Sequence, residues 1–402
     1  TRPEATPRMS TQSGLALALF LLAGAQTLAT MAVYALPVLV AYAAPDFGLA
    51  RANIGYQVGL VYLCAVFASA YGPRWLAVWG PARTTQIALC AAAAGVALLS
   101  FAHIAIAVPA TMLIGLAYGL TNPAASQLLG KLAPPARRNM VFGLKQMGVP
   151  FGVALAGLML PGTAEILGWR IAMLIAAAML LMMVIGLQFK RAAWDDDRGA
   201  PALQAGPLLL LKSPALGVIG LAAACYALVQ IGLGAHMVAM LIGDYGWDSV
   251  SAGALVGLCQ VVGGLSRIGW ALVADTRLGG QRVLMLIGGL SGIFLMMLPL
   301  VGGSETFLLV LLFIAIGGST AGWNGVLVAE SVRLAPPGAA GPASGAVISL
   351  SFAGAVLGPP LIALLGQELH GYRYAFAVLA TLPLAGAALC WFGRHARRGD
   401  FT

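Results

Sequence analysis

The chain has 402 residues, of which 60% are hydrophobic and only 9% are charged. A soluble globular protein carries about 25% charged residues, so this composition excludes an ordinary soluble protein. The net charge of +9 would suggest a nucleic-acid partner in a soluble protein. Here the basic residues lie in short loops between apolar runs, so we expect no nucleic-acid partner and interpret them as signals of membrane topology.

Twelve apolar runs follow one another along the chain. A membrane-spanning helix needs about 20 apolar residues. The first run begins near Thr11 and is too long for the hydrophobic region of a signal peptide, so we interpret it as the first span. We predict twelve transmembrane helices, at 12–42, 53–72, 84–102, 106–129, 140–163, 169–189, 215–242, 250–273, 283–302, 306–329, 342–366 and 374–393.

The largest polar break between these runs extends from Lys190 to Ser213 and contains three successive aspartates. It separates six predicted spans from the next six. We therefore predict an N-terminal six-helix bundle at 1–189, a cytoplasmic linker at 190–213 and a C-terminal six-helix bundle at 214–402.

The basic residues predict the orientation, because cytoplasmic loops of membrane proteins are enriched in Lys and Arg. If both termini are cytoplasmic, 17 of the 22 Lys and Arg residues lie on that side, and only Arg51, Arg170 and Arg373 lie outside. The remaining two, Lys145 and Arg267, lie within predicted spans. We expect a multi-pass protein of a bacterial inner membrane with both termini in the cytoplasm.

The two halves of the chain repeat each other. Residues 115–154 align with 317–356 without a gap, at an offset of 202 residues. Because shorter repeats occur in the same order in both halves, the halves are parallel duplicates related by an axis along the membrane normal. Matched positions include Asn122 with Asn324, Gly143 with Gly345, and the Leu-Ala-Pro-Pro run at 132–135 with that at 334–337.

A loop pattern between the second and third spans recurs between the eighth and ninth. The stretch from Gly72 to Arg83 is similar to the signature G-x-x-x-D-R-x-G-R-R of the major facilitator superfamily, although Ala77 replaces its acid. The second copy keeps the acid as Asp275. With its duplicated halves, the chain resembles this superfamily of secondary transporters over nearly its whole length. The resemblance implies an all-α fold of two pseudo-symmetric six-helix bundles, a substrate site at the midplane and transport by alternating access.

The resemblance also implies structural and gating residues. Near the cytoplasmic face, the loop acid Asp275 is expected to pair with Arg333. The alternative is a pair between Arg277 and Glu330. In the fifth and eleventh spans small residues allow close helix contact and prolines add hinges, and these residues are Gly148, Pro150, Gly358 and Pro359.

Two formal charges lie well away from the ends of the predicted spans, and both are positive: Lys145 in the fifth and Arg267 in the eighth. All thirteen acids can be placed in a loop or near a membrane face. Ionisable residues inside a membrane are costly and are functional by default. In the fold of the superfamily the fifth and eighth helices are neighbours across the two halves. A cavity between them would have a positive potential and favour a small anion, since Arg can hold a carboxylate by two parallel hydrogen bonds.

The segment from Arg267 to Arg277 is similar to the eighth helix of monocarboxylate and oxalate-type carriers, which implies that Arg267 contacts a substrate carboxylate. Two structural alternatives remain. Lys145 lies seven residues from Arg138, about 10 Å along a helix axis, so its side chain could reach the cytoplasmic interface. Arg267 could instead belong to the element that stabilises the loop around Asp275.

Neutral polar side chains on several spans could complete the cavity, or each could bond a neighbouring helix. Gln26 and Tyr34 share one face of the first span. His236 in the seventh span is a candidate proton site or a packing histidine. We predict a polar path lined by Gln26, Tyr34, Asn122, Gln146, Tyr226, Gln230, Gln260 and Asn324, together with the two cations.

These observations predict a secondary active transporter that moves a small organic anion, with protons or an exchanged anion as the coupling solute. The alternative is a proton-coupled efflux transporter for drugs, which would usually have an acid for cationic drugs. The five cysteines lie in apolar runs and form no C-x-x-C pair, so we expect no disulfide framework, metal or cofactor. We expect a monomer in the lipid bilayer and no enzymatic activity.

Overall fold

The computed structural model describes residues 11–48, 55–196 and 208–399, and the regular elements in these ranges are helices. Eleven helical stretches, some made of consecutive elements, are long and apolar enough to cross a membrane, and a bent pair of shorter helices raises the number to twelve among the described residues. This agrees with the predicted all-α membrane fold. The predicted start of the second span and the middle of the predicted linker lie outside the described residues.

The helices divide between the two halves of the chain. The first half contains α1 (Thr11–Val38), α2 (Val40–Phe47), α3 (Gly55–Tyr71), α4 (Pro73–Trp79), α5 (Pro81–Leu99), α6 (Ile104–Leu132), α7 (Arg138–Gln146), α8 (Gly148–Leu167) and α9 (Trp169–Gln188). Two short helices follow, α10 (Arg191–Trp194) and α11 (Leu208–Lys212). The second half contains α12 (Pro214–Gly243), α13 (Ser249–Ala274), α14 (Gly280–Met296), α15 (Thr306–Thr320), α16 (Trp323–Leu334), α17 (Ala340–Glu368), α18 (Tyr372–Leu379) and α19 (Thr381–Gly399).

One span that the sequence predicts as continuous is bent in the structure, and others are interrupted only locally. Helices α3 and α4 meet at Gly72 with a bend of 57°. A Cβ atom at Gly72 would collide with the carbonyl of Ala68 and with the side chain of Leu120. The fifth span is assigned as α7 and α8 and the tenth as α15 and α16, but each remains one helical stretch long enough to cross a membrane, Pro135–Leu167 and Thr306–Leu334. Gly and Pro account for such breaks because they weaken or delete backbone hydrogen bonds within a helix.

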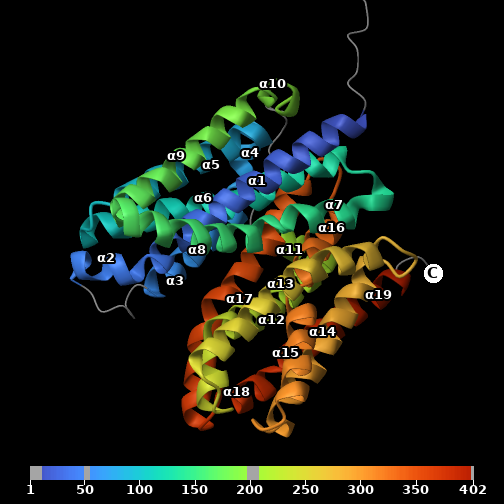
Figure 1. Cartoon of the computed structure of the whole chain (residues 1–402). Coiled ribbons are helices and arrows are strands. Elements are labelled where there is room, and N and C mark those ends of the chain that lie inside the picture. The colour runs from blue at the N-terminus through green and yellow to red at the C-terminus, as the bar shows by residue number, and fades with distance from the viewer. Residues whose placement is uncertain (1–10, 49–54, 197–207, 400–402) are drawn as a thin grey trace, which may run out of the picture.

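The two halves form separate bundles that touch along two seams (Figure 1). Helix α17 of the second half contacts α3 and α6, and α7 of the first half contacts α13 and α16. One cluster of buried apolar residues continues across the first seam, where Ile348, Phe352 and Ala355 of α17 join residues of the first half.

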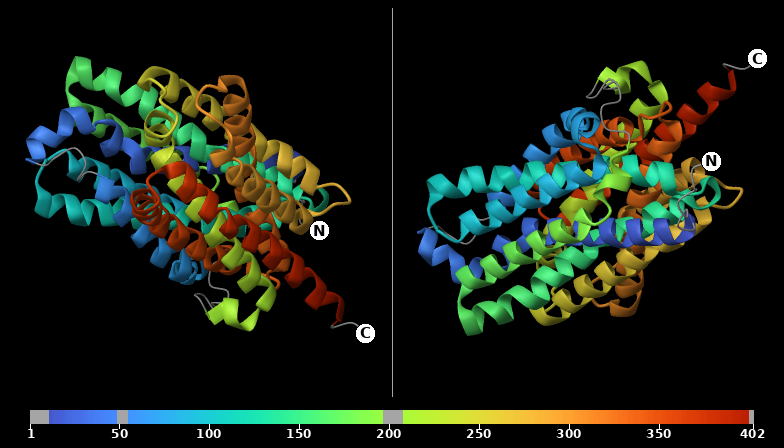
Figure 2. Two further views of the ribbon diagram at one scale, coloured as in Figure 1. Left: turned by 90° about the horizontal axis from the view of Figure 1, so that it is seen from below. Right: turned by 90° about the horizontal axis from the view of Figure 1, so that it is seen from above.

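The side on which α1 begins and α19 ends is called the terminal side below (Figures 1 and 2). On this side the halves are tied together, because Gln127 of α6 bonds backbone atoms of Gly338 and Gly341. On the opposite side α2 and α18 lie apart in the views from the front and from below. The two bundles are therefore closed at the terminal side and splayed at the other.

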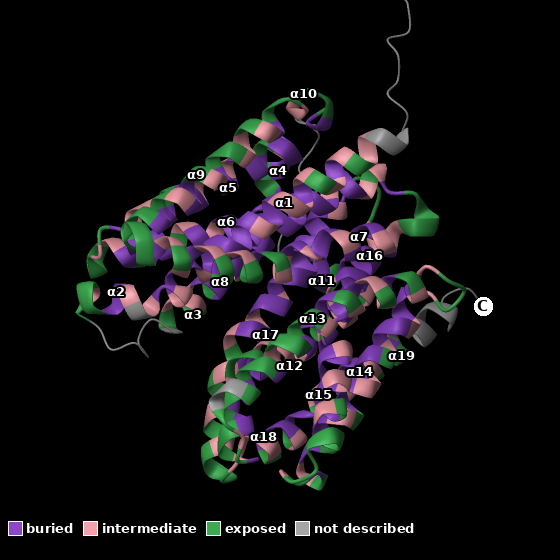
Figure 3. Cartoon of the chain, viewed as in Figure 1, coloured by how far each residue is buried: buried purple, intermediate pink, exposed green. Residues whose placement is uncertain are grey.

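Exposed residues lie along the outer faces of the helices (Figure 3), and many of them are large and apolar. Leu158 and Ile166 of α8 are 84% and 83% exposed, and Phe189 at the end of α9 is 81% exposed. Such a surface would be unfavourable in water, whereas hydrocarbon chains of lipid solvate it without cost. The polar side chains discussed below lie inside this apolar shell.

Candidate functional site

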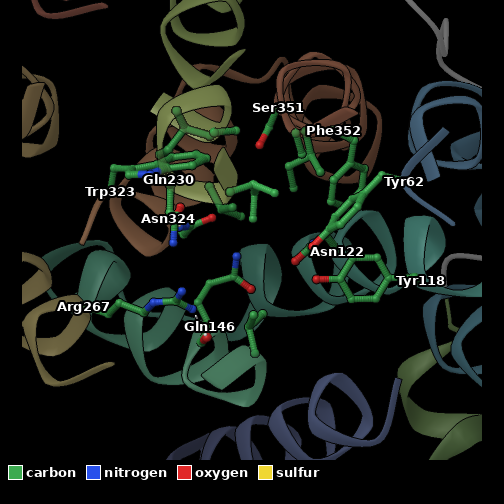
Figure 4. Close-up of a pocket in the computed structure, with 17 residues that line it drawn as sticks. Tyr62, Tyr118, Asn122, Gln146, Gln230, Arg267, Trp323, Asn324, Ser351 and Phe352 are labelled. Atoms are coloured by element: carbon green, nitrogen blue, oxygen red, sulfur yellow. Dashed lines mark hydrogen bonds between the residues drawn. The ribbon is translucent and has the colours of Figure 1, made fainter. Parts of the chain in front are cut away.

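A small cavity lies where the two halves meet (Figure 4). Its volume is about 60 Å³, enough for a small solute or a few water molecules. Helices α3, α6, α7 and α8 line it from the first half, and α12, α13, α16 and α17 line it from the second. Its polar and aromatic lining residues are Tyr62, Tyr118, Asn122, Gln146, Gln230, Arg267, Trp323, Asn324, Ser351 and Phe352.

Arg267 is the cation that lines this cavity. Its side chain comes from α13 and the residue is only 5% exposed. One guanidinium nitrogen, Nη1, donates a 2.7 Å hydrogen bond to the backbone carbonyl of Gln146 on the opposite half. Its Nε atom is buried and has no hydrogen-bond partner among the described residues. A buried guanidinium with an unused donor is unfavourable unless another acceptor is supplied.

Lys145 is buried, but it does not line the cavity. Its ammonium donates to three side-chain amide oxygens: those of Asn122, of Gln26 at 2.8 Å and of Gln146 at 3.2 Å. Three acceptors match the three donors of a protonated lysine. The side chain therefore points into the first bundle, and the alternative in which it reaches the membrane interface is not observed.

Amide side chains from both halves meet at the cavity. Asn324 of α16 donates a 3.2 Å hydrogen bond to the side-chain oxygen of Gln230 on α12. Gln146 serves both cations, because its backbone oxygen accepts from Arg267 and its side-chain oxygen accepts from Lys145. Asn122 and Asn324, which are matched positions of the repeat, both line the cavity. The structure thus brings these predicted residues together.

Gln26 and Tyr34 of α1 lie just behind the lining residues. Gln26 is fully buried and accepts from Lys145 and, at 3.1 Å, from Thr121. The hydroxyl of Tyr34 lies 3.4 Å from that of Tyr62, which does line the cavity. Both residues of α1 therefore support the wall of the cavity.

Three predicted site residues are placed elsewhere. Tyr226 is buried within the second bundle, where its hydroxyl donates a 2.9 Å hydrogen bond to the carbonyl of Leu284. Gln260 on α13 is exposed and is not among the lining residues. The ring of His236 packs on Tyr372, with 5.1 Å between ring centroids. Helix rotation decides these outcomes, because each residue lies on a face of its helix that turns away from the cavity.

The aromatic part of the cavity wall was missed by the sequence analysis. Phe352 of α17 lies 5.8 Å from Tyr62 and 5.5 Å from Tyr118, measured between ring centroids, so rings of both halves meet. Figure 4 shows the hydroxyls of both tyrosines directed towards the cavity. The repeat gave no signal for this wall, because at the offset of 202 residues Phe352 is matched with Pro150.

Asp275 ties the halves together at the terminal side, although not as predicted. Its carboxylate accepts hydrogen bonds from the backbone N–H of Asn139 at 3.0 Å and of Met140 at 2.9 Å, and from the Asn139 side chain at 2.8 Å. These residues form the first turn of α7, so the acid satisfies otherwise unpaired helix donors and complements the helix dipole. The predicted pair between Asp275 and Arg333 is wrong, because the carboxylate is already engaged by α7.

The alternative pair between Arg277 and Glu330 is also wrong. Glu330 instead binds Arg333, three residues further along α16, through both carboxylate oxygens. Arg277 is exposed and lines a polar crevice of about 410 Å³ beside Asp275 and Glu330. The i,i+3 spacing within one helix explains this preference, since it places the two side chains on the same face.

The predicted glycines lie at close helix contacts. A Cβ atom at Gly148 would lie 2.6 Å from the carbonyl of Ala23 on α1, and one at Gly358 would collide with the carbonyl of Leu228 on α12. Pro150 packs against Gly264 of α13, with 3.7 Å from its ring to an added Cβ there. Pro359 lies within α17, which continues through it.

Two duplicated helical bundles that enclose a polar cavity at their interface define a membrane transporter of small solutes. The family follows from the sequence comparison: the model of the Major Facilitator Superfamily matches residues 19–354. The chain belongs to this superfamily. The resemblance predicted from the loop signature and the repeated halves is confirmed.

Curated relatives include an uncharacterised MFS-type transporter of Mycobacterium tuberculosis, 27% identical over 281 residues. That alignment covers 68% of this chain and 62% of the mycobacterial protein, so it spans less than two thirds of the relative's length. Monocarboxylate transporter 13 of Rattus norvegicus is 26% identical over 336 residues, covering 80% of this chain and 76% of the rat protein. The predicted similarity to monocarboxylate carriers is thereby confirmed at the level of sequence.

Solved structures share the fold over almost the whole chain. FucP in its outward conformation has a TM-score of 0.72 at 13% identity and covers 93% of this chain and 98% of its own. The human organic anion transporter MFSD10 has a TM-score of 0.68 at 17% identity, with coverages of 95% and 100%. At these identities the likeness concerns the fold.

Proposed function

We propose that this protein is a secondary active transporter that moves a small organic anion, a monocarboxylate, by alternating access. The observation that carries the proposal is Arg267. It is a buried cation at the interface of the halves, with a donor that has no partner among the described residues. The lining residues of the cavity include no Asp or Glu. A substrate carboxylate would supply both the missing acceptor and the missing negative charge.

A single carboxylate fits this site better than two. Lys145 donates to three amide oxygens and lies behind the cavity wall, so it contributes positive potential without offering a contact. Opposite Arg267 the wall is aromatic, formed by Tyr62, Tyr118 and Phe352. This combination favours a short molecule with one charged end and one apolar end. The relationship to monocarboxylate transporters of mammals supports the same substrate class.

The orientation that we propose has both termini in the cytoplasm of a bacterial inner membrane, with 190–213 as a cytoplasmic linker between the two bundles. The basic loops support it through the positive-inside rule. In this orientation the closed terminal side is cytoplasmic, so the structure is an outward-facing state. The cavity is complete within one chain, which supports a monomer as the transporting unit.

Transport of a proton with the anion, or exchange of two anions, would drive accumulation. His236 does not line the cavity. A proton bound by His236 would therefore not be in direct contact with an anion bound in the cavity. Uptake of radiolabelled L-lactate into proteoliposomes separates the two modes. An imposed pH gradient drives the first, and unlabelled anion inside the vesicles drives the second.

The anion proposal is tested by a thermal-shift screen of purified protein against L-lactate, pyruvate, benzoate, succinate, nitrate and a cationic drug. We expect stabilisation by monocarboxylates. Arg267→Gln should weaken the apparent affinity by about 10- to 100-fold, since a hydrogen bond to a charged group contributes about 1.5–3 kcal/mol. Arg137→Gln, which removes an exposed arginine, is the matched control. Stabilisation by the cationic drug alone, unchanged in Arg267→Gln, would favour the drug-efflux alternative and overturn the proposal.

A further inference from the structure

The carbonyl of Gln146 lacks its normal partner in the helix. In an α-helix the carbonyl of residue i accepts from the N–H of residue i+4. For Gln146 that residue is Pro150, which has no N–H. The backbone stays helical through this point, with Met147 at φ −61° and ψ −22°, and the bond from Phe151 to Met147 follows. Pro150 thus creates one unpaired acceptor without unfolding the span.

Arg267 of the other half occupies that acceptor. Its Nη1 atom donates to the Gln146 carbonyl at 2.7 Å. Helix α13 can pack closely against α7 because residue 143 of α7 is a glycine and residue 271 of α13 is an alanine. A Cβ atom at Gly143 would lie 2.7 Å from the Cβ atom of Ala271 and 3.1 Å from the carbonyl of Arg267. Pro150 itself packs against Gly264, one turn before Arg267. The proline therefore supplies both the acceptor and part of the surface against which α13 packs.

The same arrangement occurs a second time within the first half. Pro123 in α6 cannot donate to the carbonyl of Gly119, and the hydroxyl of Ser69 donates to it at 2.6 Å instead. At the repeat offset of 198 residues that relates Ala77 to Asp275, Ser69 is the counterpart of Arg267. Helices α3 and α13 are the second spans of their halves. In both cases a side chain of this span donates a hydrogen bond to a backbone carbonyl that a proline on a neighbouring helix has left unpaired.

We propose that Pro150 is a positioning residue for the anion site. By removing one N–H it offers the Gln146 carbonyl to Arg267, which holds Nη1 at the seam between the halves. In a guanidinium the Nε and Nη2 donors lie side by side on one edge, and with Nη1 held this edge keeps the Nε donor that has no partner among the described residues, to which a carboxylate would bind. The significance for anion binding rests on the proposed function, whereas the coupling between Pro150 and Arg267 does not.

A double-mutant cycle tests the coupling without any ligand. Pro150→Ala restores an N–H that can bond Gln146 within the helix and compete with Arg267. We expect the change in melting temperature caused by Pro150→Ala to differ at least about twofold between the two backgrounds and to be more favourable in Arg267→Gln, where the Gln146 carbonyl has lost its donor, because residues that share a partner are not additive. Pro161→Ala, which restores an N–H further along α8, is the matched control and should be additive with Arg267→Gln. Pro150→Gly replaces Pro150→Ala if the latter is not recovered folded.

A second readout concerns transport of L-lactate. Pro150→Ala should raise KM at least threefold with a smaller change in kcat, since the proline orients Arg267 and does not touch the anion. Additive effects of Pro150→Ala and Arg267→Gln on ligand-free stability would overturn the inference and leave Pro150 as a helix-bending residue. If the cycle is coupled but wild type responds to no anion, the positioning role stands and the proposed function fails.

Discussion

At the scale of single residues, two buried cations that look equivalent in the sequence have different surroundings. Arg267 lines the cavity and keeps a donor without a partner among the described residues, whereas Lys145 is enclosed by three amide oxygens. The sequence predicted that both are buried near the interface of the halves. It could not assign all their partners, because two of the three amides around Lys145 come from α1 and α6, more than 20 residues away along the chain.

The amide cage predicts a structural cost for removing Lys145. Lys145→Met keeps the length of the side chain but leaves the oxygens of Asn122 and Gln146 without this donor, while Gln26 keeps Thr121. We expect a loss of about 1–3 kcal/mol in the free energy of unfolding, the cost of an unpaired buried polar atom. Anion affinity should fall less than in Arg267→Gln.

Thermal and urea unfolding of the purified protein measure this loss. The control is Lys131→Met, which removes an exposed ion pair with Asp196 and should cost at most about 1 kcal/mol. A Lys145→Met protein as stable as wild type would contradict this expectation and show that the cost of burying the ammonium offsets its hydrogen bonds.

At the scale of helices, small residues set how closely the elements approach. Gly148 and Gly152 of α8 pack directly on the backbone of α1, where an added Cβ would lie within 2.6 Å of a carbonyl. The spacing of small residues predicted close contact in the fifth span, but not which helix it contacts. Packing decides this, because the same spacing fits any neighbour with a complementary groove.

Two glycines of α8, one packed against α1 and one with open space around it, test the contact. Gly148→Leu should reduce the melting temperature strongly, since the side chain would displace α1, and overpacking a core costs about 1–3 kcal/mol or more. Gly162→Leu should be nearly neutral, because no atom lies within 4 Å of an added Cβ there. Equal effects of the two substitutions in differential scanning fluorimetry would contradict the packing of α8 on α1.

At the scale of the whole molecule, the terminal-side closure is asymmetric. The carboxylate of Asp275 caps the first turn of α7, whereas the amide oxygen of Gln127 accepts from the N–H of Gly341 at the start of α17 at 3.0 Å. Asn139 and Gly341 are matched positions at the offset of 202, so equivalent helix ends are capped by different groups. The loss of the first-half acid at Ala77 is therefore compensated at this position by a neutral residue from α6.

This asymmetry predicts that Asp275 contributes more to the closed terminal side than Gln127. A charged acceptor at a helix N-terminus forms stronger hydrogen bonds than a neutral one. A cysteine placed at the buried Ser344 of α17 should react with maleimide several-fold faster in Asp275→Ala than in wild type, and Gln127→Ala should have a smaller effect. Asp196→Ala, which removes an exposed acid, should leave the rate unchanged. A larger effect of Gln127→Ala would reverse the proposed ranking.

The sequence by itself determined a membrane protein of duplicated six-helix halves with two buried cations and a polar midplane. These features follow from composition, the length of apolar runs and the repeat, which need no knowledge of packing. Only the tertiary structure decided that Arg267 faces the cavity, that Tyr226 turns away from it and that Phe352 completes its aromatic wall. Helix rotation and the partners of unpaired backbone groups decide such outcomes, and both depend on contacts between helices that are distant in the chain.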